Sequence, residues 1–111
     1  MTKTRKQDII AIERSGNLNQ LKFEWDDEKE QKNIIKHKID FSTAALVFDD
    51  ENRIEMYDDR HSSDEDRYIT IGQVNDFTFI VMVVYTERGE AIRIISARLA
   101  TKREKEMYYY G

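Results

Sequence analysis

The stretch FTFIVMVVYTERGEAIRIISAR, residues 77–98, has the pattern of two strands joined by a tight turn. Residues 77–86 form a nearly continuous apolar run and residues 92–98 form a shorter one, and runs of this length beside turn residues are typical of strands. Gly89 lies between them and can adopt the positive φ that a short turn requires. The stretch therefore predicts an antiparallel hairpin.

Two further strands are predicted before this hairpin. Apolar and polar residues alternate along residues 53–57 and 67–74, and Asn75 with Asp76 suits a two-residue turn. Short connections of this kind join antiparallel neighbours in a sheet. Residues 53–98 are therefore predicted to form a four-stranded antiparallel meander.

The segment before the meander predicts one more strand and two helices. Residues 21–25 alternate like a short strand, and Asp27 with Glu30 has the spacing of a capping box for a helix ending at His37. Ser42 is predicted to cap a second helix that ends at Phe48. The order up to this point is β-α-α.

A terminal helix completes the predicted fold. Thr101 with Glu104 forms a second capping box, after which the helix runs into Tyr108, Tyr109 and Tyr110. The whole order predicts an α+β domain with its helices on one face of the sheet. The three tyrosines could stack on a base, although such a cluster more often packs a terminal helix against a sheet.

The chain is long enough for one domain. With 111 residues it can build a single modest core, which we place in residues 23–111. Residues 1–22 are interpreted as an N-terminal extension or tail, in which a short isoleucine group would form at most a frayed helix.

The strand over residues 77–86 is apolar on both of its faces. Phe77, Phe79 and Val81 begin one face, and Ile80 and Met82 begin the other. Helices on one side leave the second face open as a partner site or a cleft. The simpler alternative is a central strand, which is often apolar on both sides.

Composition limits the classes of function. The chain has no cysteine, so it has no disulfide, thiol nucleophile or cysteine-bound zinc, and its longest apolar run is far too short to cross a membrane. We expect a cytoplasmic protein. The net charge of −4 is spread unevenly, at +3 over residues 1–22, −9 over residues 23–66 and +2 over residues 67–111. The C-terminal half could therefore present a basic surface to a phosphate backbone.

Strand direction predicts a basic site at one end of the meander. Arg67 begins one strand, Arg88 ends the next and Arg93 begins the last, so all three fall at the same end, which His61 can reach from the preceding loop. Arg98 falls at the far end, about 17 Å from Arg93 at ~3.4 Å per residue.

Three arginines beside a histidine suit phosphoryl chemistry on RNA. Guanidinium groups match phosphate oxygens and keep their charge, so they can stabilise the charge that develops in the transition state. A histidine can accept the proton of a ribose 2′-hydroxyl or donate one to the leaving 5′-oxygen. This predicts cleavage to a 2′,3′-cyclic phosphate with His61, Arg67, Arg88 and Arg93 as catalytic residues, and with no metal or cofactor.

Two other interpretations of these residues remain open. Arg67 and Arg93 could simply pair with nearby acids, and His61 could be solvated; the candidate acids are Asp64, Glu65, Asp66, Glu87 and Glu90. The acidic loop over residues 58–66 could also be considered as a metal site. Its spacing fits no EF-hand and it lacks the required glycine, so a solvated loop is the better interpretation.

Three runs of the sequence resemble the BrnT toxin family. They are FEWDDEKEQKNIIKHKIDFSTAALVFDD, DDRHSSDEDRYITIG and VVYTERGEAIRIISARLATKREKEMYYY, which extend from Phe23 to Tyr110. The most specific parts are FEWD, NIIKH, Arg60 with His61, Ile71 with Gly72, and IRIISAR.

The resemblance implies a RelE-like ribonuclease toxin of a type II toxin–antitoxin system, which stops growth by degrading RNA. It also implies a BrnA-type antitoxin partner with a ribbon-helix-helix DNA-binding part. Such a partner would block the toxin, form a heterotetramer and repress its own operon, so DNA would be bound only through the antitoxin. The resemblance supports His61 and the four arginines as family-pattern residues, and we expect further RNA contacts from Lys36, Arg60, Arg98, Lys102 and Arg103.

Two positions depart from the family pattern. Lys38 stands where glycine is usual, which predicts that the first helix ends without a left-handed cap. Glu51 stands where proline is frequent.

Two rival functions remain possible at this stage. One is a non-catalytic module that only binds an antitoxin and co-represses its operon. The other is a DNA-binding regulator, although no recognition helix is evident.

Overall fold

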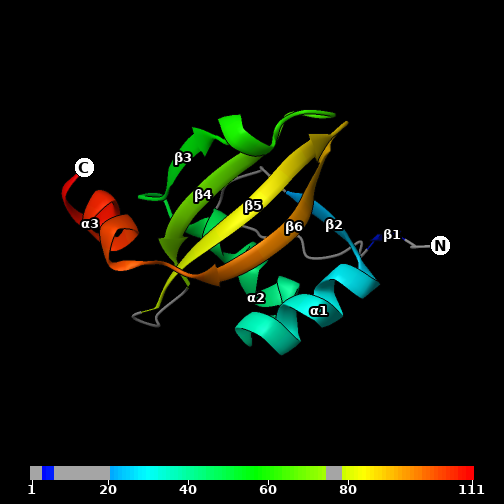
Figure 1. The fold of residues 1–111 in the computed structure, drawn as a ribbon, viewed down its shortest axis with the longest axis horizontal. Coiled ribbons are helices and arrows are strands. Elements are labelled where there is room, and N and C mark those ends of the chain that lie inside the picture. Colours follow the sequence, from blue (N-terminus) through cyan, green and yellow to red (C-terminus); the bar gives the residue numbers. More distant parts are fainter. Residues whose placement is uncertain (1–3, 7–20, 75–78) are drawn as a thin grey trace.

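The computed structural model describes residues 4–6, 21–74 and 79–111. They form a mixed α+β fold built on a six-stranded sheet with the order β1-β2-β6-β5-β4-β3 (Figure 1). The strands are β1 (Thr4–Lys6), β2 (Lys22–Asp26), β3 (Ile54–Tyr57), β4 (Tyr68–Gln73), β5 (Ile80–Arg88) and β6 (Ala91–Leu99). The helices are α1 (Asp27–His37), α2 (Phe41–Ala45) and α3 (Lys102–Tyr110), with two 3₁₀ turns, η1 (Leu46–Asp49) and η2 (Asp59–His61).

The predicted meander is confirmed. Strands β3, β4, β5 and β6 pair in chain order and antiparallel, and Gly89 turns β5 into β6 with φ of 61°. The register of β5 and β6 shifts between Val84 and Tyr85, which is a bulge in the ladder. The predicted turn at Asn75 and Asp76 lies outside the described residues.

The N-terminal strands extend the sheet on the other side of β6. Strand β2 pairs parallel to β6, from Lys22 opposite Ala91 to Trp25 opposite Ile94, and β1 pairs antiparallel to β2. Residues 4–6, within the predicted N-terminal extension, therefore form a strand that was not predicted. The predicted isoleucine group falls outside the described residues.

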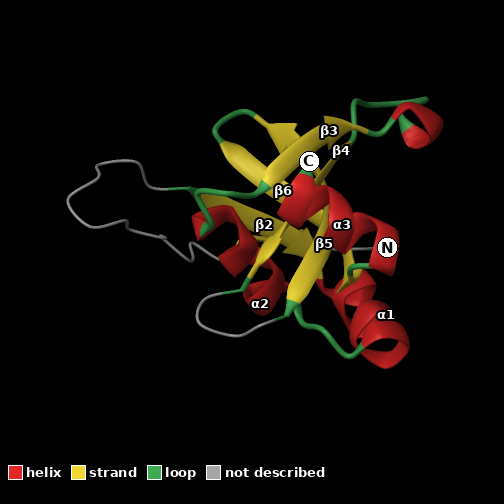
Figure 2. Cartoon of the chain, turned by 90° about the vertical axis from the view of Figure 1, so that its left-hand side faces the viewer, coloured by secondary structure: helices red, strands yellow, loops and turns green. Residues whose placement is uncertain are grey.

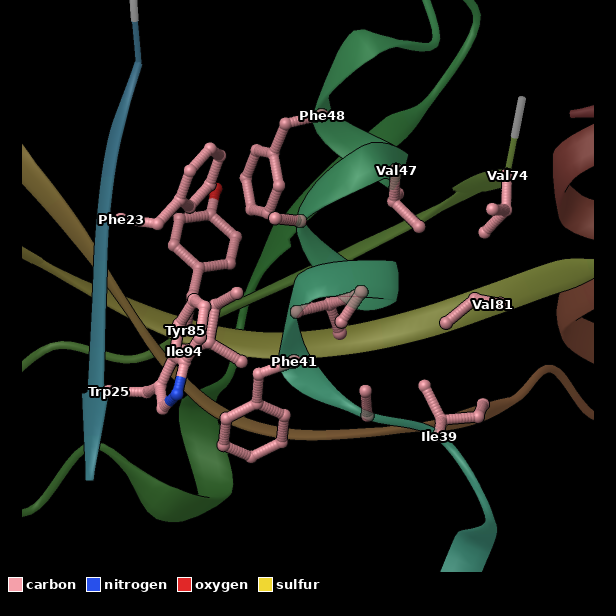
Figure 3. Close-up of a cluster of buried hydrophobic side chains, with 14 residues drawn as sticks. Phe23, Trp25, Ile39, Phe41, Val47, Phe48, Val74, Val81, Tyr85 and Ile94 are labelled. Atoms are coloured by element: carbon pink, nitrogen blue, oxygen red, sulfur yellow. The ribbon is translucent and has the colours of Figure 1, made fainter. Parts of the chain in front are cut away.

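The larger core lies between the sheet and α2 with η1. Phe41 is fully buried on α2, and Phe48 of η1 packs at 5.0 Å from the ring of Tyr85 and at 5.3 Å from that of Phe23 (Figure 3). The ring of Trp25 meets Phe41 edge-on at 6.0 Å. These ring contacts bring β2 and β5, distant in sequence, against one helical layer.

A second core cluster lies on the opposite face of the sheet. Ile71, Ile80, Met82 and Ala100 are buried there, and Tyr108 of α3 packs against them. The prediction that all helices cover one face is therefore wrong, because α3 turns back over the far end of this second face (Figures 1 and 2). β5 is a central strand with apolar contacts on both sides, as the simpler alternative held.

Asp50 holds α3 in this position. Its Oδ2 accepts the Tyr108 hydroxyl at 2.6 Å and the backbone N–H of Gln73 at 2.7 Å. Burial, reinforced by this carboxylate, raises the pKa of Tyr108 above its ordinary value. Tyr109 and Tyr110 are exposed, so only the first of the three tyrosines packs.

The N-cap of the first helix lies one residue earlier than predicted. Asp26 is its N-cap, with Oδ1 accepting the N–H of Glu28 at 2.8 Å and that of Lys29 at 3.4 Å. The predicted Asp27–Glu30 box is wrong, because the Glu30 carboxylate instead accepts the N–H of Phe41 at 2.9 Å. This contact joins the start of α2 to α1.

The predicted N-cap of α2 is wrong, whereas that of α3 is confirmed. Asp40, not the predicted Ser42, caps α2 by accepting the N–H of Thr43 at 2.7 Å. The capping box of Thr101 and Glu104 at the start of α3 is confirmed. An aspartate is thus the N-cap of both α1 and α2.

Asn33 anchors α1 to the middle of β6. Its amide donates to the carbonyls of Ile39 at 2.9 Å and Ala97 at 2.8 Å, and its oxygen accepts the N–H of Ala97 at 3.1 Å. Because β2 pairs with β6 only as far as Ile94, the next part of that β6 edge faces α1. A helix side chain here takes the place of a neighbouring strand.

Lys38 ends α1 in the left-handed conformation. Its φ is 63°, and its N–H donates to the carbonyl of Ile34 at 2.9 Å. The prediction that lysine would prevent a left-handed cap is therefore wrong, because the chain adopts this cap despite the Cβ. That conformation costs roughly 1–2 kcal/mol for a residue with a side chain.

Replacing Lys38 with glycine should stabilise the protein. Relief of the left-handed strain, less the extra freedom of glycine in the unfolded chain, should raise the free energy of unfolding by about 0.5–1 kcal/mol. The measurement is urea unfolding of the variant beside the parent. Lys36→Gly, inside the same helix, is the control and should destabilise by about 1 kcal/mol. A Lys38→Gly variant no more stable than the parent would contradict the strain argument.

Glu51 occupies a turn in which proline would be accommodated. The N–H of Arg53 donates to the carbonyl of Asp50 at 3.2 Å, which places Glu51 at the second position of the turn. Proline is favoured at that position.

Among the helices that the structure describes, none is long and apolar enough to cross a membrane.

Candidate functional site

The structure brings the three predicted arginines to the same end of the sheet. Arg93 lies opposite Thr86, Arg88 lies opposite Ala91, and Arg67 directly precedes β4, whose first residue pairs with Tyr85. Arg98 lies opposite Met82, several residues further along β6. The predicted separation of Arg93 and Arg98 along the strand is therefore confirmed.

The loop between β3 and β4 is closed at its base by backbone and serine contacts. The N–H of Asp58 donates to the carbonyl of Arg67 at 2.8 Å. The hydroxyl of Ser62 donates to the carbonyl of Asp58 at 2.6 Å and accepts the N–H of Arg67 at 2.9 Å. The contacts fix η2, with His61 at its end, relative to the start of β4.

His61 is held by a buried carboxylate. Its Nδ1 lies 3.1 Å from Oδ2 and 3.2 Å from Oδ1 of Asp58. The imidazole is 63% exposed while the Asp58 side chain is 9% exposed. When Nδ1 donates to Asp58, the neutral ring presents Nε2 as an acceptor.

The aspartate partner is the site residue that the sequence analysis missed. In the sequence, Asp58 is only one of several acids in the loop over residues 58–66. Its three-residue spacing from His61 was the available signal, but a 3₁₀ turn is needed to bring the two side chains together, and that turn was not predicted.

Arg67 and Arg88 differ in how they are held. Arg88 pairs with Glu65 at 3.5 Å, with both side chains partly exposed. The side chain of Arg67 is half-buried and forms no ion pair with any other residue that the structure describes. The pair of Arg88 was not predicted, and the pairing alternative for Arg67 finds no partner among the described residues. A weak, exposed pair such as Arg88–Glu65 opens at little cost.

Arg93 forms an ion pair that the sequence analysis did not foresee. Its Nη1 lies 3.3 Å from Oε2 of Glu24, and the two side chains are only 12% and 10% exposed. The residues are direct neighbours on the parallel strands β2 and β6. None of the acids that were considered as partners supplies this contact.

Arg98 is a structural residue in this fold. Its guanidinium binds both carboxylate oxygens of Glu104, at 2.9 and 3.0 Å, and also donates to the carbonyl of Leu99. Partial burial opposes ionisation of Glu104, but the hydrogen bonds from Arg98 and the Thr101 amide outweigh it and lower its pKa. This bidentate contact joins the end of β6 to the first turn of α3.

The other predicted RNA contacts do not gather at one place. Arg60 is exposed beside His61, Lys102 and Arg103 are exposed on α3, and Lys36 is exposed on α1. No three histidine, aspartate or glutamate side chains of the described residues are grouped so as to hold a metal ion.

Comparison with known proteins identifies the family of the chain. No curated protein matches the chain. Residues 25–104 match the family described as the ribonuclease toxin, BrnT, of type II toxin–antitoxin systems. That match covers most of the chain and includes Asp58, His61 and all four arginines. The chain belongs to the BrnT family of ribonuclease toxins.

Proposed function

We propose that this toxin is a metal-independent endoribonuclease with a RelE-like fold. Its site would lie at the end of the sheet where β4 begins and β5 ends. The observation that carries the proposal is the contact between the buried Asp58 carboxylate and the exposed His61 imidazole. A carboxylate that holds one ring nitrogen aims the other at substrate and stabilises the ring once it is protonated.

In the proposed reaction, His61 acts through Nε2. It takes the proton of a ribose 2′-hydroxyl, and the 2′-oxygen forms a bond to the adjacent phosphorus while the bond to the 5′-oxygen breaks. The leaving oxygen takes a proton from the imidazolium or from water. The products are a 2′,3′-cyclic phosphate and a 5′-hydroxyl, so no oxidant or further reactant is required.

The arginines would bind the scissile phosphate. Arg67 is available without breaking a contact among the described residues, and Arg88 can exchange its exposed pair with Glu65 for a phosphate. Arg93 would have a different part, because Glu24 already holds its guanidinium. In the proposal, Arg93 stabilises the fold at this end of the sheet and does not bind the phosphate.

We also propose a BrnA-type antitoxin as the protein partner, in a heterotetramer that acts in the cytoplasm and represses its own operon. An apolar pocket of about 280 Å³ supports a protein partner. It is lined by His37, Lys38, Ile39, Thr43, Val74, Phe79, Val81 and Leu99. The exposed side chains of Phe79 and Leu99 border it, and exposed apolar surface of this kind marks contacts with other proteins.

The alternative is a toxin that no longer cleaves and only binds its antitoxin. The Arg93–Glu24 and Arg88–Glu65 pairs favour it, since both arginines have protein partners. A stable complex with the antitoxin, without any cleavage of RNA by the free toxin, would establish this alternative.

The test is cleavage of end-labelled RNA by the purified chain in excess EDTA. We expect the parent to yield cyclic phosphate ends, and Arg67→Ala to cleave about 10- to 100-fold more slowly, because it loses ~1.5–3 kcal/mol of hydrogen bonding to the phosphate. Lys105→Ala, on the exposed face of α3, is the control and should match the parent.

Two outcomes would count against this proposal. Equal rates for Arg67→Ala and the parent would remove Arg67 from the site. If the parent does not cleave free RNA, the assay is repeated with translating ribosomes, and inactivity there too would establish the binding-only alternative.

A further inference from the structure

A basic groove lies between α1 and β6, away from the end of the sheet described above. It has a volume of about 320 Å³ and is lined by Lys29, Lys32, Asn33, Lys36, His37, Ile95 and Ser96. No acidic residue is among its lining residues. In a chain with a net charge of −4, this concentration of positive charge is unusual.

The groove exists because β2 is shorter than β6. Strand β2 pairs with β6 only as far as Ile94, so Ile95 and Ser96 lie at an edge that no strand covers among the described residues. Asn33 binds the next residue along, Ala97, and holds α1 against this edge. The position of the lysines relative to β6 is therefore set by a buried contact.

The lysines form one stripe along α1. Lys29, Lys32 and Lys36 follow the three- and four-residue spacing that places side chains on the same helix face. Lys29 and Lys36 are about 10 Å apart along the helix axis at ~1.5 Å per residue. A row of this length can meet successive phosphates of one strand.

None of the three lysine ammonium groups forms an ion pair with another residue that the structure describes. Glu30, the acidic residue that follows Lys29 on α1, turns its carboxylate to the N–H of Phe41 instead. No acid of α1 among the described residues therefore forms an ion pair with the stripe. The stripe is available to an external anion.

The pKa of His37 reflects the positive charges at the end of the groove. Its pKa is lowered, first by partial burial and then by repulsion from Lys36 and Arg98. A polyanion bound in the groove would relieve that repulsion. The geometry of the stripe, not this shift, carries the inference.

We infer that this groove binds the phosphate backbone of single-stranded RNA outside the site of cleavage. The inference rests on the proposed function, because it takes RNA as the substrate. An acidic protein segment is the competing occupant. RNA is favoured because the lining is mostly charged and polar, with Ile95 as its one apolar side chain, whereas protein partners usually add apolar anchors.

The experiment measures binding separately from cleavage. The probe is a fluorescent 2′-O-methyl RNA of ~12 nucleotides, within the range of ~4–16 nucleotides typical of single-strand sites. It lacks the 2′-hydroxyl nucleophile and so cannot be cleaved by the proposed reaction. Its affinity is measured by anisotropy over a range of salt concentrations for the full chain.

The test variant is Lys32→Ala with Lys36→Ala, and the control is Lys105→Glu, which changes the net charge by the same amount. The double variant should bind about tenfold more weakly, and its salt slope should fall by about 1.4, or ~0.7 for each lost phosphate contact. The control should stay within about twofold of the parent. With cleavable RNA, the double variant should raise KM and leave kcat unchanged.

Unchanged affinity and salt slope in the double variant would overturn the inference. Unchanged RNA binding with loss of antitoxin from the co-expressed complex would also overturn it, and would assign the groove to an acidic protein segment. If the parent binds the probe through these lysines but cleaves no RNA, the groove stands and the proposed catalysis fails. If the parent cleaves RNA and the double variant binds the probe as tightly as the parent, the proposed catalysis stands and the groove is not an RNA site.

Discussion

His61→Ala should cleave RNA about 10²- to 10⁴-fold more slowly than the parent, the usual contribution of a positioned general acid or base. The imidazole is mostly exposed, so the cost in stability should come mainly from the buried Asp58 carboxylate, which loses its partner. Initial rates with end-labelled RNA in EDTA provide the measurement. Ser63→Ala, an exposed change in the same loop, should cleave at the parent rate.

Asp58→Asn separates positioning from chemistry. Asparagine can keep a hydrogen bond to Nδ1, but it can favour the wrong tautomer and cannot stabilise the protonated ring by charge. We expect a loss of rate, with thermal stability close to that of His61→Ala. A His61→Ala variant that is folded and cleaves at the parent rate would show that the catalytic base lies elsewhere.

Arg93→Ala should destabilise the protein by about 3 kcal/mol. Removing one partner of a buried ion pair leaves the other charge unpaired, which typically costs ~3–5 kcal/mol, and we take the low end because both side chains keep some exposure. Urea unfolding should show a lower midpoint with an unchanged m value. Unfolding at the parent midpoint would mean that the pair with Glu24 contributes nothing structural.

A loss of cleavage in Arg93→Ala would therefore be ambiguous, since an unfolded toxin is also inactive. The double variant Glu24→Gln with Arg93→Met removes both charges together and should recover most of the lost stability. If this variant is folded and cleaves at the parent rate, Arg93 is structural only. If it is folded and inactive, Arg93 contributes to the site beyond its role in the fold.

Local patterns in the sequence were enough to predict most of the fold. The alternation of residues 53–98 with a glycine at the hairpin turn predicted the meander, and Thr101 with Glu104 predicted the start of α3. The runs around Asn33, His61 and Arg93 also indicated the family. These signals succeed because turns, caps and strand alternation depend on residues close together in the chain.

The predictions that failed concern residues whose conformation depends on tertiary contacts. Lys38 adopts a conformation that its residue type disfavours, because tertiary packing of α1 and α2 outweighs a local cost of roughly 1–2 kcal/mol. Tyr108 crosses to the second face of the sheet because Asp50, far away in sequence, accepts its hydroxyl. Local propensity carries no information about either partner.

By itself the sequence determined the antiparallel meander, the family and the end of the sheet where three arginines gather. Only the tertiary structure decided which of those arginines is available, because β2 pairs parallel to β6 and places Glu24 beside Arg93. It also decided that Asp58 orients His61 and that α1 lays its lysines along an open strand edge. The reason is physical: charge pairing depends on distance in space, and chain folding sets that distance between residues whose separation in sequence says nothing about it.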